Sequence, residues 1–265
     1  MTRTPEEHGA RFDEKAADYD DDQSEEYRRC ADLVISYASP GSEETVLDIG
    51  TGTGEIALAL APEAKRVLGR DVSEGMLDRA RRKADLRGIE TVAFDKGRFR
   101  ELRVSEPVDV VVSNFAMHHL ADEEKRAAID AIADLGPRKF VLGDVMFFGK
   151  PDPDEPFFSP EVDDPATVGV LADALTDAGF ALTAVESVGS ESRRGGDGEA
   201  VEAVHDQVGV LVAERTERAG RIEEPIAGRE TDDVTDSEER DAESGAATSE
   251  GPIVPDEGGT ASHEE

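Results

Sequence analysis

Three glycines at alternate positions carry the clearest chemical signal in the sequence. They follow an apolar run, Thr45 to Ile49, and precede a second apolar segment, Ile56 to Ala61; they are Gly50, Gly52 and Gly54. A buried strand, a tight turn and a helix start in this order let backbone amides approach a bound nucleotide-like ligand closely. A dinucleotide fingerprint requires glycine where Glu55 stands, so the spacing disfavours a nicotinamide-dependent dehydrogenase.

An acid, Asp71, directly follows the next apolar strand, Val67 to Arg70. A carboxylate at this place can accept hydrogen bonds from both hydroxyls of a ribose, and each charge-assisted bond is worth about 1.5–3 kcal/mol. The other interpretation is an N-cap for a helix over 73–87. Ser73 already fills that position, so we expect Asp71 to bind a sugar.

Together these residues resemble motif I and the following strand of the class I S-adenosylmethionine-dependent methyltransferases. The likeness covers about residues 10–215 and implies S-adenosyl-L-methionine as the cofactor, with Asp71 on its ribose. The resemblance implies that one group of residues faces the amino-acid end and the ribose of the cofactor: Asp48, Gly50, Thr51, Gly52 and Gly54. It also implies that Val72 and Met76 make apolar contact with the adenine.

The sequence departs from the family pattern after the third predicted strand. Family members usually have an aspartate there that receives the adenine amino group, whereas this chain has Arg98 between Gly97 and Phe99. Arginine has no acceptor lone pair and cannot make that contact. Either Asp95 substitutes, or backbone groups and stacking on Phe99 hold the adenine. The departure also leaves open a degenerate cofactor-binding protein that regulates or scaffolds a partner.

The segment from Ser113 to Leu120 resembles the family segment that lies beside the transferred methyl group. Its candidate catalytic residues are Asn114, His118 and His119. Methyl transfer is an in-line displacement, so alignment does most of the work, and a base is needed only where the acceptor carries a proton. A histidine suits that task because it titrates near neutrality. The alternative is that one histidine caps the following helix and the other packs under the loop.

Metal binding by this segment is not expected. His119 and Glu123 stand at helical spacing, but the sequence offers no third ligand beside them, so we expect no metal.

The order of elements predicts an α/β fold with a doubly wound, mostly parallel sheet. Strands are expected at 45–49, 67–70, 91–94, 108–113 and 139–143, with an antiparallel pair at 181–188 and 207–213. Helices are expected over 73–87 and 123–135, the latter capped by Asp122, and from Asp164-Pro165 to Gly179. The resemblance implies seven strands in the order 3-2-1-4-5-7-6.

Three regions are expected along the chain. Residues 1–40 form an N-terminal helical lid, in which Tyr19 contacts the cofactor and Phe12 is an apolar plug; the alternative is that both residues only anchor the helix to the sheet. Residues 41–215 form the methyltransferase (Rossmann-like) domain, and Asp144 to Phe148 could line its substrate pocket. Residues 216–265 lack core-forming side chains and are expected to be a disordered acidic tail.

Charge and composition narrow the partners. The formal net charge is −33, and lysines number 7 against 22 arginines, which resembles the proteins of extreme halophiles. Nucleic acid is an improbable partner, although an RNA or protein methyltransferase stays open if the basic islands 79–83 and 98–103 meet beside the pocket. The single cysteine, Cys30, and the absence of a leader or long apolar run predict a cytoplasmic, membrane-free protein. The oligomeric state is not predicted. A small-molecule acceptor is the leading hypothesis.

Overall fold

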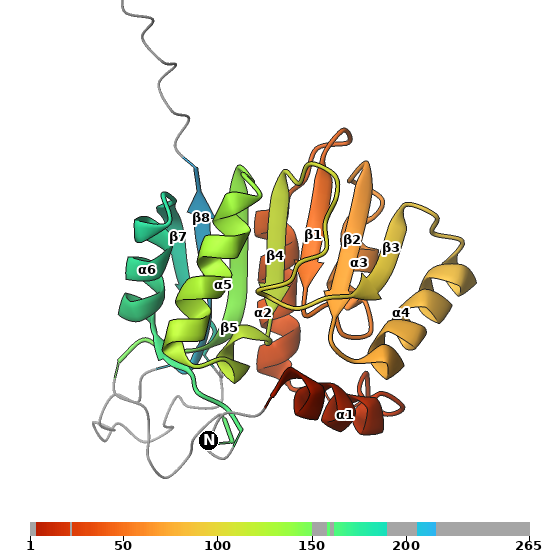
Figure 1. Ribbon diagram of the computed structural model, residues 1–265, viewed down its shortest axis with the longest axis horizontal. Coiled ribbons are helices and arrows are strands. Elements are labelled where there is room, and N and C mark those ends of the chain that lie inside the picture. The colour runs from red at the N-terminus through yellow and green to blue at the C-terminus, as the bar shows by residue number, and fades with distance from the viewer. Residues whose placement is uncertain (1–3, 22, 150–157, 160–161, 190–205, 216–265) are drawn as a thin grey trace, which may run out of the picture. The chain divides into compact units, whose positions relative to one another are not determined.

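The computed structural model describes residues 4–21, 23–149, 158–159, 162–189 and 206–215, and Figure 1 shows their arrangement. A single sheet has the order β3-β2-β1-β4-β5-β8-β7, and a two-residue strand, β6, pairs with β5 outside this path. The first five strands run parallel, and β8 is antiparallel to both β5 and β7. The predicted fold class and strand order are therefore confirmed, with β6 as an addition.

The elements have the following bounds. The strands are β1 (Thr45–Ile49), β2 (Arg66–Asp71), β3 (Val92–Lys96), β4 (Val110–Asn114), β5 (Lys139–Phe147), β6 (Ala166–Thr167), β7 (Ala181–Ser187) and β8 (Val208–Glu214). The helices are α1 (Pro5–Lys15), α2 (Glu25–Ala38), α3 (Glu55–Leu60), α4 (Glu74–Arg87), the single-turn η1 (Met117–His119), α5 (Asp122–Asp134) and α6 (Val168–Asp177).

Two apolar layers cover the sheet, one on each face. Strand residues alternate between the layers: Val46 and Val67 pack with α2, α3 and α4, whereas Leu47 and Leu68 pack with α5 and α6. The central strands β1 and β4 are buried throughout, which explains their continuous apolar sequences. Burial of such side chains contributes about 1.5–3 kcal/mol each and fixes the strand register that brings the loops together.

The expected lid, residues 1–40, contains two helices with different surroundings. In α2 the side chains of Cys30, Ala31, Val34 and Ala38 are buried in the sheet core, so this helix is a covering layer of the domain. Cys30 is a fully buried core residue. In contrast, α1 lies beyond the carboxyl ends of β1 and β2 in Figure 1 and packs against α4.

Two predicted helix starts are wrong. Asp122 is the first helical residue of α5, and Ala121 occupies the cap position with extended backbone angles. Helix α6 starts at Val168 instead of Asp164, because Ala166 and Thr167 pair with β5 and the Thr167 hydroxyl caps the helix. The predicted tail, 216–265, lies outside the described residues. Among the described helices, none is long and apolar enough to cross a membrane.

Candidate active site

A pocket lies at the carboxyl ends of the parallel strands, where an open α/β sheet binds ligands. Ten residues predicted from the sequence line it: Tyr19, Gly50, Gly52, Asp71, Val72, Met76, Arg98, Phe99, Asn114 and His119. Residues from α1, β2, β4 and the loops that follow these strands thus meet around one cavity. Phe12 also lines it, as the lid hypothesis requires.

The glycine turn is held against β2 by main-chain bonds. The amides of Gly50 and Thr51 both donate to the carbonyl of Arg70, at 2.8 and 3.0 Å. Gly50 has φ +74°, and a Cβ there would lie 2.4 Å from that of Ala116. A side chain would therefore meet both a left-handed backbone and a neighbouring turn, which explains the glycine.

Asp71 joins the glycine turn to the start of α4. Its Oδ2 accepts from the Gly52 amide at 2.8 Å, and its Oδ1 accepts from the Ser73 amide at 2.9 Å. Ser73 is the N-cap of α4, as predicted, because its hydroxyl accepts from the Met76 amide. Burial raises the pKa of Asp71, against these amide bonds. Each carboxylate oxygen retains a lone pair for a hydroxyl, so Asp71 can hold a diol.

Three predicted cofactor residues support the loop from behind and are not among the described residues that line the pocket. Asp48 is buried, and its Oδ2 accepts the Thr51 hydroxyl at 2.7 Å. Burial raises the pKa of Asp48 to about 7, against the Thr51 hydrogen bond. Gly54 begins α3 in the left-handed conformation, where a Cβ would lie 2.9 Å from Phe94. The expected contacts of Asp48, Thr51 and Gly54 with the cofactor stay predictions.

Arg98 and Phe99 both line the pocket, but Asp95 is not among its lining residues in the described chain. The Asp95 carboxylate is exposed and lies 3.5 Å from Arg70. The guanidinium of Arg98 pairs with Glu101 at 3.2 Å, and Phe99 is buried. The alternative in which backbone groups and the Phe99 ring hold the adenine stays a prediction.

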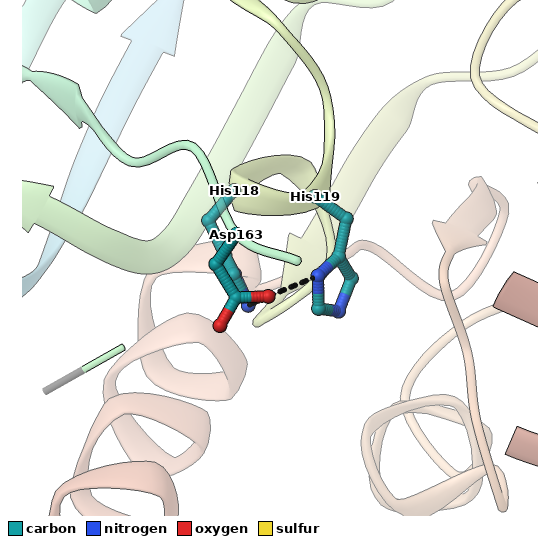
Figure 2. A group of neighbouring side chains, drawn as sticks. All are labelled: His118, His119 and Asp163. Carbon is teal, nitrogen blue, oxygen red and sulfur yellow. Dashed lines mark hydrogen bonds and ion pairs between the residues drawn. The ribbon is translucent and has the colours of Figure 1, made fainter. Parts of the chain in front are cut away.

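The two histidines have different surroundings. His119 lines the pocket, and its Nδ1 lies 2.8 Å from Oδ1 of Asp163. His118 is buried behind it, outside the lining set of the described residues, with its Nδ1 2.5 Å from Oδ1 of Asp144. A carboxylate only accepts hydrogen bonds, so each imidazole carries a proton on Nδ1. In His119 the other ring nitrogen points away from Asp163 (Figure 2).

Burial and the two carboxylates set the charge of each imidazole. Burial lowers the pKa of His119 to about 4, despite its Asp163 partner. Burial opposes the charged form of His118 too, but the Asp144 carboxylate outweighs it and raises the pKa. The pKa of Asp163 falls to about 2 because hydrogen bonds from His119 and the Ser159 amide outweigh burial. His119 is therefore neutral near pH 7, with a lone pair on Nε2.

Asn114, the last residue of β4, presents an amide side chain at the pocket. It lies in the pocket lining and is 6% exposed. Its side chain interacts with the hydroxyl of Tyr27, which also lines the pocket. An amide carries two donor hydrogens and two acceptor lone pairs, so Asn114 has hydrogen-bonding capacity left for a ligand.

Hydrogen bonds and ion pairs connect α1 and the segment that follows it to α4. The Asp20 carboxylate accepts from Lys83 at 3.0 Å and from Arg79 at 3.2 Å, and it binds the Thr53 hydroxyl. The Asp13 carboxylate accepts from the Gly75 amide at 2.8 Å. These bonds hold Phe12 and Tyr19 over the pocket.

Several lining residues were missed by sequence reasoning. They are His8, Tyr27, Ile49, Gly97, Arg100, Phe115, Ala116, Leu120 and Glu124. Most lack a motif of their own, and α1 and α2 bring the first two into place from far along the chain. The aromatic rings of Tyr27 and Phe115 lie 5.1 Å apart and form an apolar part of the lining.

Comparisons with known proteins agree with this geometry. A methyltransferase-domain family model matches residues 46–135. An uncharacterized methyltransferase of Staphylococcus carnosus is 31% identical over 149 residues, covering 51% of this chain and 67% of the relative. Another, from Geobacillus sp. (strain WCH70), is 33% identical over 139 residues, covering 51% of this chain. The chain spans only 63% of the length of that second relative.

The fold also occurs in a solved structure of magnesium protoporphyrin IX methyltransferase from Synechocystis PCC 6803 with bound SAM. The TM-score is 0.54 with 21% identity, over 72% of this chain and 80% of that one. The fold, the glycine turn, the carboxylate of Asp71 at the end of β2 and the matched relatives all indicate the same family. The chain belongs to the class I S-adenosylmethionine-dependent methyltransferases.

Proposed function

We propose that this protein transfers the methyl group of S-adenosylmethionine to a small-molecule acceptor. The observation that carries the proposal is that Asp71 and Gly52 line the same pocket as Asn114 and His119. The first pair suits a ribose, and the second suits a polar acceptor.

The residues present fit the cofactor. Gly52 lines the pocket with φ +54°, a left-handed backbone conformation that favours glycine. Asp71 offers acceptors for the ribose hydroxyls, Val72 and Met76 offer apolar contact, and Asn114 offers an amide. When bound, S-adenosylmethionine supplies an electrophilic methyl group on a sulfonium.

The protein itself aligns the acceptor with the methyl group, excludes water from the pocket and accepts one proton from the acceptor. Positioning of reactants can contribute about 7–11 kcal/mol to lowering a barrier. Phe12, Tyr19 and Tyr27 cover the pocket with aromatic surface, which favours a dry site. For a hydroxyl acceptor, Nε2 of His119 accepts the proton, with Asp163 holding the ring in the required tautomer. His118 acts behind it as an anchor bound to Asp144.

The basic islands give little support to an RNA or protein acceptor. Arg79 and Lys83 are paired with Asp20, and Arg81 is paired with Glu74 and Asp78. Arg100 and Arg103 are paired with Glu124 and Glu101. Because these cations are neutralised within the chain, a phosphate backbone gains little from them. A cytoplasmic location and adaptation to high salt remain parts of this proposal, supported by the single cysteine and the acidic composition.

The test combines binding with transfer of label. Calorimetry in molar KCl should detect S-adenosylmethionine binding to the folded protein. Incubation of the protein with methyl-labelled cofactor and a cell extract should place label in the ultrafiltrate, and Asp71→Asn should abolish most of it while Asp95→Asn should not. Label in the retained macromolecules would favour the RNA or protein alternative. A folded protein with no detectable binding would favour the scaffold.

A further inference from the structure

Two imidazoles and a carboxylate converge beside the pocket. His118 and His119 come from η1, and Asp163 comes from the segment that precedes β6 (Figure 2). Oδ1 of Asp163 lies 2.8 Å from Nδ1 of His119 and 3.9 Å from Nε2 of His118. One ligand-type atom from each residue lies within 4.8 Å of the others, and all three side chains are at most 15% exposed. The sequence expectation of no metal site missed Asp163 as the third group.

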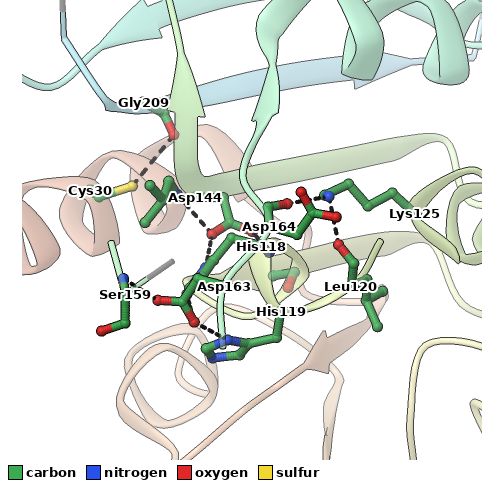
Figure 3. A network of polar contacts seen from close by, with 12 residues as sticks. Cys30, His118, His119, Leu120, Lys125, Asp144, Ser159, Asp163, Asp164 and Gly209 are labelled. Atoms are coloured by element: carbon green, nitrogen blue, oxygen red, sulfur yellow. Dashed lines mark hydrogen bonds and ion pairs between the residues drawn. The ribbon is translucent and has the colours of Figure 1, made fainter. Parts of the chain in front are cut away.

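A second set of contacts orients these three groups. Nδ1 of His118 is engaged by Asp144, whose other oxygen accepts the His118 amide at 3.0 Å (Figure 3). This bond turns Nε2 of His118 toward Asp163. Oδ2 of Asp163 accepts the Ser159 amide at 2.8 Å, which leaves Oδ1 facing the histidines. A carboxylate behind the far nitrogen of an imidazole is the usual support of a metal-binding histidine, because it fixes the ring and the tautomer.

We propose that His118, His119 and Asp163 bind a divalent transition-metal cation of the zinc class. Zinc takes imidazole and carboxylate ligands at about 2.0–2.2 Å, so tetrahedral ligand atoms lie about 3.4 Å apart, between the two distances observed. Movements of the three side chains would bring the three ligand atoms, which lie within 4.8 Å of one another, to that separation.

Charge also favours a cation in this place. Asp144 and Asp163 bring two buried carboxylates against the two rings. The buried ammonium of Lys125 is bonded to the carbonyls of Leu120 and Asp164 and to Asp122. A divalent cation matches the charge of both carboxylates, and three protein ligands leave a fourth position for water or an acceptor oxygen.

The cation would change what His119 offers to the pocket. Binding through Nδ1 replaces the hydrogen bond to Asp163, and the ring proton then resides on Nε2. His119 becomes a donor toward the pocket in place of a proton acceptor. Metal occupancy and the base role of His119 therefore exclude each other in one molecule, and the metal site is independent of whether the cofactor binds.

The test measures the metal alone. The full chain, stripped with a chelator and returned to KCl, is titrated with Zn²⁺ by calorimetry and with Co²⁺ by visible absorption. We expect one tight Zn²⁺ per chain and the intense ligand-field bands of a tetrahedral Co²⁺ site. Asp163→Asn and His119→Gln should each weaken Zn²⁺ binding at least about tenfold, and Asp144→Asn by about 10- to 100-fold.

The control is Asp164→Asn, which removes the same charge one residue away on an exposed side chain and should bind like the wild type. All variants keep the acidic surface, so weak binding of Zn²⁺ to surface carboxylates contributes equally to each titration and does not affect the comparison. Wild-type Zn²⁺ affinity equal to that of both Asp163→Asn and His119→Gln, or a Co²⁺ spectrum without tetrahedral bands, would overturn the proposal. The stripped protein should still bind S-adenosylhomocysteine, so failure of the metal site is distinguishable from failure of the proposed function.

Discussion

Replacement of Asp71 by asparagine provides the sharpest test of the cofactor pocket. The carboxylate binds the amides of Gly52 and Ser73 and has lone pairs left for two hydroxyls. Asparagine keeps one acceptor oxygen and turns the other position into a donor, so one hydroxyl loses its charge-assisted bond. Such a bond is worth about 1.5–3 kcal/mol, which corresponds to about a 10- to 150-fold weaker Kd.

The assay is calorimetry with S-adenosylhomocysteine in molar KCl, because this compound occupies the pocket without reacting. The matched control is Asp95→Asn, which removes the same charge on the neighbouring strand from an exposed side chain outside the pocket lining. Thermal melting of both variants separates loss of affinity from loss of structure. If Asp71→Asn binds as tightly as Asp95→Asn while both remain folded, the assignment of the ribose to Asp71 is wrong.

Three further predictions follow from charges at other places. Burial raises the pKa of Asp48 to about 7 in the folded chain, whereas the unfolded chain releases this proton near pH 4. The free energy of unfolding should therefore fall by up to about 4 kcal/mol as the pH rises from about 4 to about 7. Asp48→Asn should remove this fall, seen by urea unfolding at pH 5 and pH 8; parallel curves for both proteins would contradict it. Asp20→Asn loses two partly exposed ion pairs, to Arg79 and Lys83, worth about 0.2–1 kcal/mol each. Because these pairs hold the segment after α1 over the pocket, S-adenosylhomocysteine should dissociate several-fold faster in a stopped-flow experiment. An unchanged rate would show that these ion pairs do not retain the ligand. With a net charge of −33, dialysis into low salt should weaken the near-UV circular dichroism and molar KCl should restore it; a spectrum indifferent to salt would argue against halophilic adaptation.

The sheet could be predicted from sequence because its signals are local. Apolar runs such as Thr45 to Ile49 are buried on both faces, and the resemblance supplied the strand order. Gly50 and Asp71 also follow from local chemistry, since a left-handed turn requires glycine and the acid directly follows a strand. The start of α6 was missed because Ala166 and Thr167 pair with β5, a long-range contact that overrides the favourable Asp164-Pro165 start.

The chemistry around the histidines could not be predicted in the same way. Asp163 is 44 residues from His119, and Asp144 is 26 residues from His118, so no spacing rule connects them. Their pairing depends on the paths of β5 and of the segment before β6. The hydrogen bond between Asp48 and Thr51 could not be predicted either. The sequence of a strand end does not indicate whether its acid faces a ligand or a threonine three residues later.

The architecture makes cofactor binding and loop stability parts of one equilibrium. Asp71 uses the same two oxygens to join Gly52 to Ser73 and to face the pocket, and Asp20 ties the lid to both α4 and the glycine turn through Lys83 and Thr53. A ligand that bonds to Asp71 therefore adds to contacts that already order the loop. Because anything that binds only the folded chain stabilises it, the cofactor should raise the melting temperature by an amount that grows with its concentration above Kd.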